Sequence, residues 1–560
     1  MEQRRRIAGL LRKRVLILDG AMGTELYKRG LPAGVCPEAW SMANPSALRE
    51  IHAAYRDAGA DIVYTGTFGA NRIKMGQYGL ANVRETNRTL AAVAKKAAGP
   101  KSFVAGDIGP TGRFVEPFGD LPFEDAVAVF REQVEGLLEG GVDCFVIETM
   151  MDIQEARAAL IAVRELSDLF AIATMTYEKH GRTLNGTDPV TALVTLQGLG
   201  ADAVGCNCSS GPEAMIEMIA AMKPHARVPL VAKPNAGLPR LVGDATVFDM
   251  DAAAFAAFGG RFASAGVNLM GGCCGTTPAH IGALRATLAG ERPVAPAHSG
   301  IAAVSSARNA RILNRNEALV IVGGRLNVAE NELLRQAVSA GDMGPVRQAV
   351  RDQEKEGASI LLLNIGAPGI DEAKSLGTIL TQLAPTTRIP LMIDVVQGET
   401  VEEILRRYPG RLLVRAPFGR ETWTPLFPVA ARYGAVPVPR CRPEDGRVEC
   451  RAAIRDLIAQ ARRHDFTKEE IVIDLSAGEA VPEPEAVRTA LDLISWCADD
   501  AGCRTLLDVT GIGRGLPEPQ WLQAAVLAAA QAAGLTLAIA DPALKELMQI
   551  RAAGDLLRGR

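Results

Sequence analysis

The chain has 560 residues, of which 48% are hydrophobic and 22% charged, a composition that is typical of a globular enzyme and excludes a disordered chain. Its 61 basic and 64 acidic residues leave a formal net charge of −3, so the balance predicts neither a nucleic acid nor an anionic membrane as a partner. Ten cysteines, in a chain whose basic N-terminus lacks the apolar core of a secretory signal, favour reduced thiols, and we expect a cytoplasmic protein.

Short β-rich apolar runs alternate with longer helical patterns through the first half of the chain. This alternation is typical of βα units in a parallel sheet. Eight such units, about 250 residues in all, close a (β/α)8 barrel. The eight runs of the first half are 15–20, 61–68, 102–109, 144–149, 171–177, 203–210, 230–237 and 267–275.

Residues 293–316 interrupt the alternation with Pro, Ser and Ala, which indicates an interdomain linker. The alternation then restarts over 317–560, again with eight runs, whereas doubly wound open sheets have about five or six strands. We therefore predict an α/β fold of two TIM barrels in tandem, the first over 1–292. The runs of the second half are 318–324, 359–366, 390–395, 411–416, 434–440, 470–476, 504–510 and 535–541.

Polar residues and thiols gather where the strands of the first barrel end, which is where α/β barrels place their sites. Cys208 ends the sixth run, and Cys273 and Cys274 end the eighth. Because these strands lie on the same side of a closed barrel, the three thiols can converge. Three sulfurs with one open position are the pattern of a catalytic zinc site. The other unusual strand-end residues are Asp19, Thr65, Thr67, Asp107, Glu148 and Asn235.

Two further interpretations of the cysteines stay open from spacing alone. A free cysteine is usually a small buried hydrophobe, and this is our expectation for six of the other cysteines. Cys206 lies two residues before Cys208, so strand alternation points both side chains the same way and leaves a closed site with four cysteine ligands as an alternative. The six cysteines expected to be buried are Cys36, Cys144, Cys441, Cys450, Cys497 and Cys503.

Four motifs in order over about residues 8–290 resemble the homocysteine S-methyltransferase family, which includes betaine- and S-methylmethionine-dependent enzymes and the first domain of cobalamin-dependent methionine synthases. The resemblance implies that Cys208, Cys273 and Cys274 bind zinc and that the homocysteine thiolate takes the open position. Cys206 stands where the family often has a small residue, which favours a supporting role. The motifs are Asp19-Gly-Ala-Met-Gly-Thr24, Gly205-Cys-Asn-Cys-Ser-Ser-Gly211, Lys233-Pro-Asn-Ala-Gly237 and Gly271-Gly-Cys-Cys-Gly-Thr-Thr-Pro278.

The remaining strand-end residues suit the rest of an amino-acid substrate. We expect Asp19 and Glu148 to accept hydrogen bonds from the substrate ammonium, with a capping or ion-pair role as the alternative for each. Asn235 is expected to hold the vacant zinc position through its amide oxygen. The substrate carboxylate is expected at backbone N–H groups of Gly20, Ala21, Met22 and Thr24.

The second half resembles the pterin-binding barrel that follows this domain in cobalamin-dependent methionine synthases. The order of the domains, the opening Gly323-Gly-Arg-Leu-Asn327 and Gly515-Leu-Pro517 carry this resemblance. It implies a pterin site at four retained residues, Asn327, Asn364, Asp394 and Asp474.

Other positions depart from the pterin-binding pattern. Leu362 stands in place of an Asp, Arg415 and Gly511 in place of Asn residues, and Gly324 in place of a Glu. Each ligand polar atom left unpaired costs about 1–3 kcal/mol. We therefore expect this barrel to bind methyltetrahydrofolate poorly.

The cobalamin domain of these synthases carries Asp-x-His-x-x-Gly. None of the six histidines here has an Asp two residues before it. The leading hypothesis is therefore methyl transfer to zinc-activated homocysteine from methylcobalamin on a separate corrinoid protein or domain, with methyltetrahydrofolate left open as the upstream donor. The alternatives are a cobalamin-independent enzyme using S-methylmethionine or betaine, with a structural second barrel, and a non-enzymatic zinc scaffold closed by four cysteines.

Overall fold

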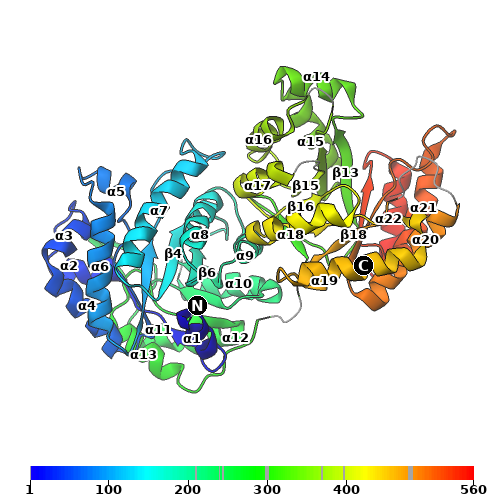
Figure 1. Cartoon of the computed structure of the whole chain (residues 1–560). Helices are drawn as coiled ribbons and strands as arrows, with labels where there is room; N and C mark the ends of the chain where they lie inside the picture. Colours follow the sequence, from blue (N-terminus) through cyan, green and yellow to red (C-terminus); the bar gives the residue numbers. More distant parts are fainter. Residues whose placement is uncertain are drawn as a thin grey trace. The chain divides into compact units, whose positions relative to one another are not determined.

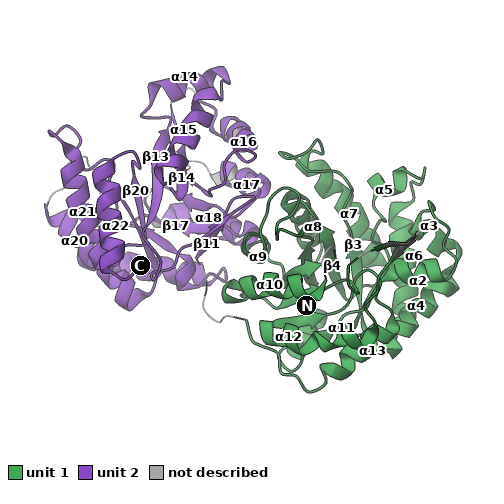
Figure 2. Cartoon of the chain, turned by 180° about the vertical axis from the view of Figure 1, so that it is seen from behind, with its two compact units in different colours: residues 1–297 green, residues 298–560 purple. Residues whose placement is uncertain are grey.

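The computed structural model describes residues 2–208, 211–238, 240–242, 245–296, 300, 302–367, 370–394, 398–476 and 484–560. The chain divides into two compact units, 1–297 and 298–560, which Figure 2 shows in different colours. Each unit has its own eight-stranded parallel sheet and its own core.

The first unit is a parallel barrel whose strands follow the order β1-β10-β7-β6-β5-β4-β3-β2. A parallel bridge between Leu18 and Ile62 joins the two ends of this sheet. Each predicted run overlaps one strand, so the eight βα units of the prediction are confirmed. The strands are β1 (Leu16–Ile17), β2 (Ile62–Tyr64), β3 (Phe103–Ile108), β4 (Cys144–Met150), β5 (Phe170–Met175), β6 (Ala203–Asn207), β7 (Leu230–Lys233) and β10 (Val267–Met270).

Helices surround this barrel in Figure 1. Several begin at a side chain that accepts a hydrogen bond from the first turn, such as Asp152 before α8 and Asp188 before α9. A small antiparallel hairpin, β8 (Arg240–Val242) with β9 (Ala245–Val247), follows β7. The helices are α1 (Glu2–Leu11), α2 (Met22–Lys28), α3 (Pro37–Ala43), α4 (Pro45–Asp57), α5 (Arg72–Gly76), α6 (Val83–Ala98), α7 (Phe123–Glu139), α8 (Ile153–Leu166), α9 (Pro189–Gly198), α10 (Pro212–Met222), α11 (Ala252–Ala257), α12 (Gly259–Ala265) and α13 (Pro278–Thr287).

The interior of the first barrel is filled by alternate residues of its strands. Leu16 and Leu18 belong to this core, as do Val146 and Ile172, because successive strand residues point to opposite faces. Ile7 of α1 packs into the same cluster. The barrel is therefore a packed core rather than a pore, and its chemistry lies where the strands end.

The second unit repeats this architecture with the strand order β17-β16-β15-β14-β13-β20-β19-β18. A parallel bridge between Arg440 and Asp474 joins the ends of the sheet. The eight runs predicted for this half each overlap one strand, so two tandem TIM-like barrels are confirmed. The strands are β13 (Val320–Asn327), β14 (Ile360–Asn364), β15 (Leu391–Asp394), β16 (Leu413–Arg415), β17 (Val436–Val438), β18 (Val472–Asp474), β19 (Arg504–Asp508) and β20 (Leu537–Ala540).

Nine described helices accompany these strands, and glycines in the left-handed conformation end several of them, among them Gly357 after α15 and Gly434 after α18. The helices are α14 (Glu332–Ala340), α15 (Gly344–Glu356), α16 (Glu372–Leu383), α17 (Gly398–Arg407), α18 (Arg420–Tyr433), α19 (Arg447–Arg462), α20 (Pro484–Trp496), α21 (Pro519–Ala533) and α22 (Lys545–Leu557).

Part of the expected linker is folded. Residues 303–312 form the hairpin β11 (Ala303–Ser305) with β12 (Ala310–Ile312), and Ala302, Val304 and Leu313 belong to the core of the second barrel. The linker interpretation of 293–316 is therefore wrong for this hairpin, because its small apolar residues are buried. Residues 297–299 and 301 lie outside the described part of the chain.

Within the described ranges, no helix has both the length and the apolar character needed to cross a membrane.

Candidate metal and substrate site

Three cysteines converge where β6 and β10 end, on either side of β7. Cys208 follows β6, whereas Cys273 and Cys274 follow β10. Their sulfur atoms all lie within 4.8 Å of one another, and the Cys208 and Cys274 sulfurs are 3.9 Å apart. Among the described residues, this is the group of His, Cys, Asp or Glu side chains whose geometry could hold a metal ion.

The segment after β7 joins the two cysteine loops through its backbone. The Cys208 N–H donates to the carbonyl of Lys233 at 3.1 Å, and the Cys273 N–H donates to that of Pro234 at 2.8 Å. The Ala236 N–H in turn donates to the carbonyl of Cys274 at 3.0 Å. These three hydrogen bonds bring together, at one place, sulfurs from two loops that are distant in the sequence.

Cys206 does not join the cluster. Its buried sulfur lies 3.9 Å from the sulfur of Met222 in α10, on the helix side of the strand. The expectation from strand alternation fails because β6 ends at Asn207 and Cys208 has a φ of 61°, in the left-handed region. This conformation is uncommon for a residue other than glycine, and it turns the Cys208 side chain away from the direction that Cys206 takes.

The donor set fits a zinc ion. Three sulfurs at about 2.3 Å from a tetrahedral ion would lie roughly 3.8 Å apart, close to the observed 3.9 Å between Cys208 and Cys274. Hydrogen bonds with Cys208 and burial raise the pKa of the Cys273 thiol well above its usual value, and the hydrogen bond with Cys208 raises the pKa of Cys274 to about 12. A bound cation would shift these thiols toward the thiolate form that zinc binds.

A buried ion pair lies beside the cysteines. Asp19 accepts from the N–H of Tyr64 at 2.7 Å and from Nζ of Lys233 at 3.1 Å. The Lys233 ammonium also lies 3.5 Å from the centroid of the Tyr64 ring. Burial raises the pKa of Asp19, and Lys233 opposes this shift. Lys233 was not among the predicted site residues, and the pair gives Asp19 the ion-pair role that the sequence left as an alternative.

Two more buried carboxyl groups, those of Glu148 and Asp107, complete an acidic cluster. Burial raises the pKa of Glu148 to about 7, and burial together with the charge of Glu148 raises that of Asp107 well above its usual value. A hydrogen bond from Asp107 acts on the pKa of Glu148 in the opposite direction. Three acids therefore surround one ammonium, that of Lys233, and the raised pKa values show that further negative charge here needs another cation, such as a cationic group of a ligand, to stabilise it.

Asn207 positions both Glu148 and the first cysteine, and sequence reasoning missed it. Its amide nitrogen donates to Oε2 of Glu148 at 3.1 Å and to Oγ1 of Thr149 at 2.7 Å. Its amide oxygen accepts from the Thr149 N–H at 2.9 Å and from Oγ1 of Thr174 at 2.8 Å. Thr149, like Cys208, has a positive φ, of 62°. The one sequence signal was that Asn207 directly precedes a candidate ligand.

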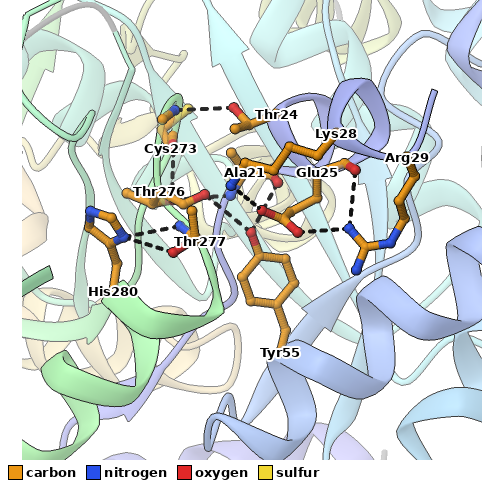
Figure 3. Close-up of polar contacts among 11 residues, drawn as sticks. Ala21, Thr24, Glu25, Lys28, Arg29, Tyr55, Cys273, Thr276, Thr277 and His280 are labelled. Carbon is orange, nitrogen blue, oxygen red and sulfur yellow. Dashed lines mark hydrogen bonds and ion pairs between the residues drawn. The ribbon is translucent and has the colours of Figure 1, made fainter. Parts of the chain in front are cut away.

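The loop with the expected carboxylate donors is tied to the second cysteine loop, as Figure 3 shows. The Ala21 N–H donates to Oγ1 of Thr276 at 3.1 Å, and that hydroxyl donates to the carbonyl of Cys273 at 2.7 Å. Tyr55 donates to the carbonyl of Ala21 at 3.0 Å. Oγ1 of Thr24 accepts from the N–H of Gly275 at 3.2 Å. The N–H of Ala21 thus has a partner within the chain, while substrate contacts of Gly20, Met22 and Thr24 stay predictions.

Of the buried polar atoms of this unit that lack a hydrogen-bond partner within the described part of the chain, three belong to residues at the strand ends around the cysteines. They are the Tyr64 hydroxyl, Oδ1 of Asp107 and Oδ1 of Asn235. Buried polar atoms are nearly always paired in folded proteins. These three therefore indicate where a bound molecule or ion completes the structure.

In the second barrel, a cavity of about 600 Å³ opens where the strands end. Asn327, Asn364 and Asp394 line it, and Oδ1 of Asn327 is buried without a hydrogen-bond partner among the described residues. Asp474 is fully buried and pairs with two arginines, Arg415 and Arg440. The structure thus brings three of the four expected pterin residues to one cavity and buries the fourth against Arg415 and Arg440, which line the same cavity.

Comparison with known proteins assigns the first barrel to a class. Residues 16–288 match the family model of homocysteine S-methyltransferases, so the first unit is a homocysteine S-methyltransferase domain. The metallated form of the homocysteine methyltransferase MmuM from Escherichia coli is 28% identical, covering 50% of this chain and 98% of that one with a TM-score of 0.43.

Similarity extends into the second barrel. The chain is 30% identical to the methionine synthase of Mycobacterium tuberculosis over 573 aligned positions, covering 95% of this chain and 48% of the relative. It is also 30% identical to the methionine synthase of Mycobacterium leprae, covering 72% of this chain and 36% of that relative. The chain thus spans less than half the length of these two relatives.

We expect metal content to depend on the converging thiols alone. Cys274→Ala should lose bound metal because it leaves two sulfurs. Cys206→Ala is the matched control: it removes a nearby thiol that faces Met222, and it should keep about one metal ion per chain. Elemental analysis of the purified proteins by mass spectrometry measures both, and metal loss in Cys206→Ala would show that the ligand set has been misassigned.

Proposed function

We propose that this chain catalyses the transfer of a methyl group to homocysteine, giving methionine, with zinc held by Cys208, Cys273 and Cys274. The observation that carries the proposal is the convergence of three sulfurs, with no fourth Cys, His, Asp or Glu ligand among the described residues, in a homocysteine S-methyltransferase domain. Three protein ligands and one open position are typical of catalytic rather than structural zinc.

Zinc would lower the pKa of the substrate thiol, which is about 8.5 for a free cysteine thiol, so that homocysteine is held as the nucleophilic thiolate at neutral pH. The protein contributes the geometry. The backbone bonds from the 233–236 segment fix the two cysteine loops, and Asn207 holds Cys208 in register with Glu148. Oδ1 of Asn235, buried and unpartnered among the described residues, supports the proposal that this amide fills the open position before substrate enters.

The acidic cluster is the proposed binding site for the substrate ammonium. Asp19 already has Lys233 as its partner, so Glu148 and Asp107 are the carboxyl groups with capacity left for a cation. The excess of acids over bases here favours a zwitterion whose ammonium points into the barrel. It also leaves the side-chain sulfur of that zwitterion to reach the cysteines.

We propose methylcobalamin as the methyl donor, presented by a protein or domain outside these 560 residues. Two observations support this: the relatives matched over most of the chain are methionine synthases, and no histidine of this sequence lies in Asp-x-His-x-x-Gly. In the reaction the sulfur–carbon bond forms as the carbon–cobalt bond breaks, and the electron pair of that bond stays on cobalt.

The test is anaerobic incubation with homocysteine and free methylcobalamin, followed by the absorbance of cob(I)alamin and by methionine analysis. We expect both products to form in equal amounts, and Cys208→Ala to form neither. A parallel incubation replaces methylcobalamin with S-methylmethionine. Methionine from S-methylmethionine alone would contradict the proposed donor, and no methionine from either donor in the zinc-loaded protein would contradict the proposed function.

Substrate affinity should depend on the ionisation of Glu148. The carboxylate form binds an ammonium and the neutral form does not, so a pKa of about 7 makes affinity rise as pH increases from about 6 to about 8. Methionine is the suitable probe, because it has no thiol to titrate. Glu148→Gln should weaken methionine binding about ten- to hundredfold at about pH 8 and remove the pH dependence.

Glu155→Gln is the matched control for this calorimetric titration. Burial also raises the pKa of Glu155 to about 7, but this residue lies in α8 and accepts from the N–H and hydroxyl of Thr111. It should retain the pH dependence. A rise in affinity with pH that persists in Glu148→Gln would assign the titrating group elsewhere.

A further inference from the structure

The floor of the cavity in the second barrel is closed by an arginine. Arg415, the last residue of β16, has a side chain that is only 6% exposed. Its Nε donates to Oδ2 of Asp474 at 2.7 Å, and its Nη1 donates to Oδ2 of Asp394 at 3.0 Å. One guanidinium thus connects the carboxylates of two strands, β15 and β18, that lie on either side of β16 and β17 in the sheet.

A second arginine and a serine also contact the carboxylate oxygens of Asp474. Nε of Arg440 lies 3.3 Å from Oδ2 of Asp474, and the guanidinium of Arg440 lies 4.0 Å from the centroid of the Phe418 ring. Oδ1 of Asp474 accepts from both the N–H and the hydroxyl of Ser476. Although burial alone would raise the pKa of Asp474, the two arginines outweigh it and lower this pKa. The carboxylate is therefore ionised and fully engaged.

This arrangement does not fit a pterin. The aminopyrimidinone edge of a pterin is a planar row of N–H donors on a guanidine-like carbon, and carboxylates are its natural acceptors. A guanidinium offers the same kind of planar donor row and lacks any acceptor. In this barrel Arg415 already gives that row to Asp394 and Asp474, so the pterin would meet its own donor pattern in place of the acceptors.

The size of the cavity does not explain why a pterin does not fit. The cavity of about 600 Å³ is large enough for a pterin, and Arg415 lines it together with Leu362 and Gly511. Neither the side chain of Leu362 nor Gly511, which has none, offers a group to replace the engaged carboxylates, and the further carboxylate that lines the cavity, Asp508, already accepts from the N–H and hydroxyl of Thr510. The restriction is therefore one of hydrogen-bond chemistry, and it centres on Arg415.

We infer that Arg415 is a specificity-determining residue of the second barrel, which closes the barrel to pterins, methyltetrahydrofolate included, by holding Asp394 and Asp474 in an internal ion-pair network. A pterin would have to displace two charge-assisted hydrogen bonds, and the loss of each weakens binding about ten- to hundredfold. This inference concerns the second barrel alone and does not depend on the reaction proposed for the first.

The test is calorimetric titration of the whole chain with methyltetrahydrofolate. The parent protein should show no binding at micromolar concentrations. Arg415→Asn should bind at least about tenfold more tightly than the parent, because it frees both carboxylates and supplies an amide that can donate and accept. Arg514→Asn is the matched control, since Arg514 lines the same cavity but pairs with Glu330 at its exposed rim; it should bind no better than the parent.

Two results would overturn the inference. One is a micromolar dissociation constant in the parent that Asp394→Ala abolishes. The other is a folded Arg415→Asn, verified by an unchanged circular dichroism spectrum, with no gain in affinity. If Arg415→Asn does not fold, Arg415→Lys replaces it: a lysine keeps the charge but offers no planar fork to span both carboxylates. It should also gain affinity, and a folded Arg415→Lys without that gain would contradict the inference.

Discussion

The metal site of the first barrel depends on the hydrogen bonds that the segment 233–236 makes with the loops on both sides of it. Each bond is an extension of the parallel ladder past the ends of β6, β7 and β10. The register of these three strands therefore determines where the three sulfur atoms lie. A change in any one of these bonds would move a ligand, whereas the packed core below them would be unaffected. The metal site is thus a consequence of how the barrel closes, and it needs no dedicated loop.

Much of the architecture was predictable because parallel strands buried on both faces are continuous apolar runs. All sixteen barrel strands lie within or overlap such runs. The failures have local causes. The hairpin at 303–312 was assigned to a linker since its residues are small, and Cys206 was left as a candidate ligand because strand alternation ends one residue before Cys208. No pattern in sequence marks a positive φ at a cysteine.

The sequence could predict which types of residue form the site, but it could not predict which residues pair with one another. The three cysteines converge as their strand-end positions predicted, whereas the substrate roles of Glu148 and Asn235 stay predictions. The partnership of Asp19 with Lys233 and the four hydrogen bonds of Asn207 join residues that are far apart along the chain. Such pairings depend on strand order and register, which a single sequence does not contain.

The two barrels have the same architecture but differ in how the buried polar groups at their strand ends are paired. In the first, buried polar atoms of Tyr64, Asp107 and Asn235 lack partners among the described residues, and acids outnumber bases. In the second, Arg415 joins the acids of two strands into a network of its own. Unpaired buried groups are costly, so the first barrel is suited to a ligand that completes it. In the second barrel the chain itself supplies partners to Asp394 and Asp474.

The central claim is a metal site with three sulfur ligands and one position for substrate. X-ray absorption spectroscopy at the zinc edge tests it most directly, with and without homocysteine. The account predicts three sulfurs and one oxygen or nitrogen around zinc in the substrate-free protein, and four sulfurs once homocysteine is added. Four sulfurs before any substrate is present, or a spectrum that homocysteine leaves unchanged, would contradict it.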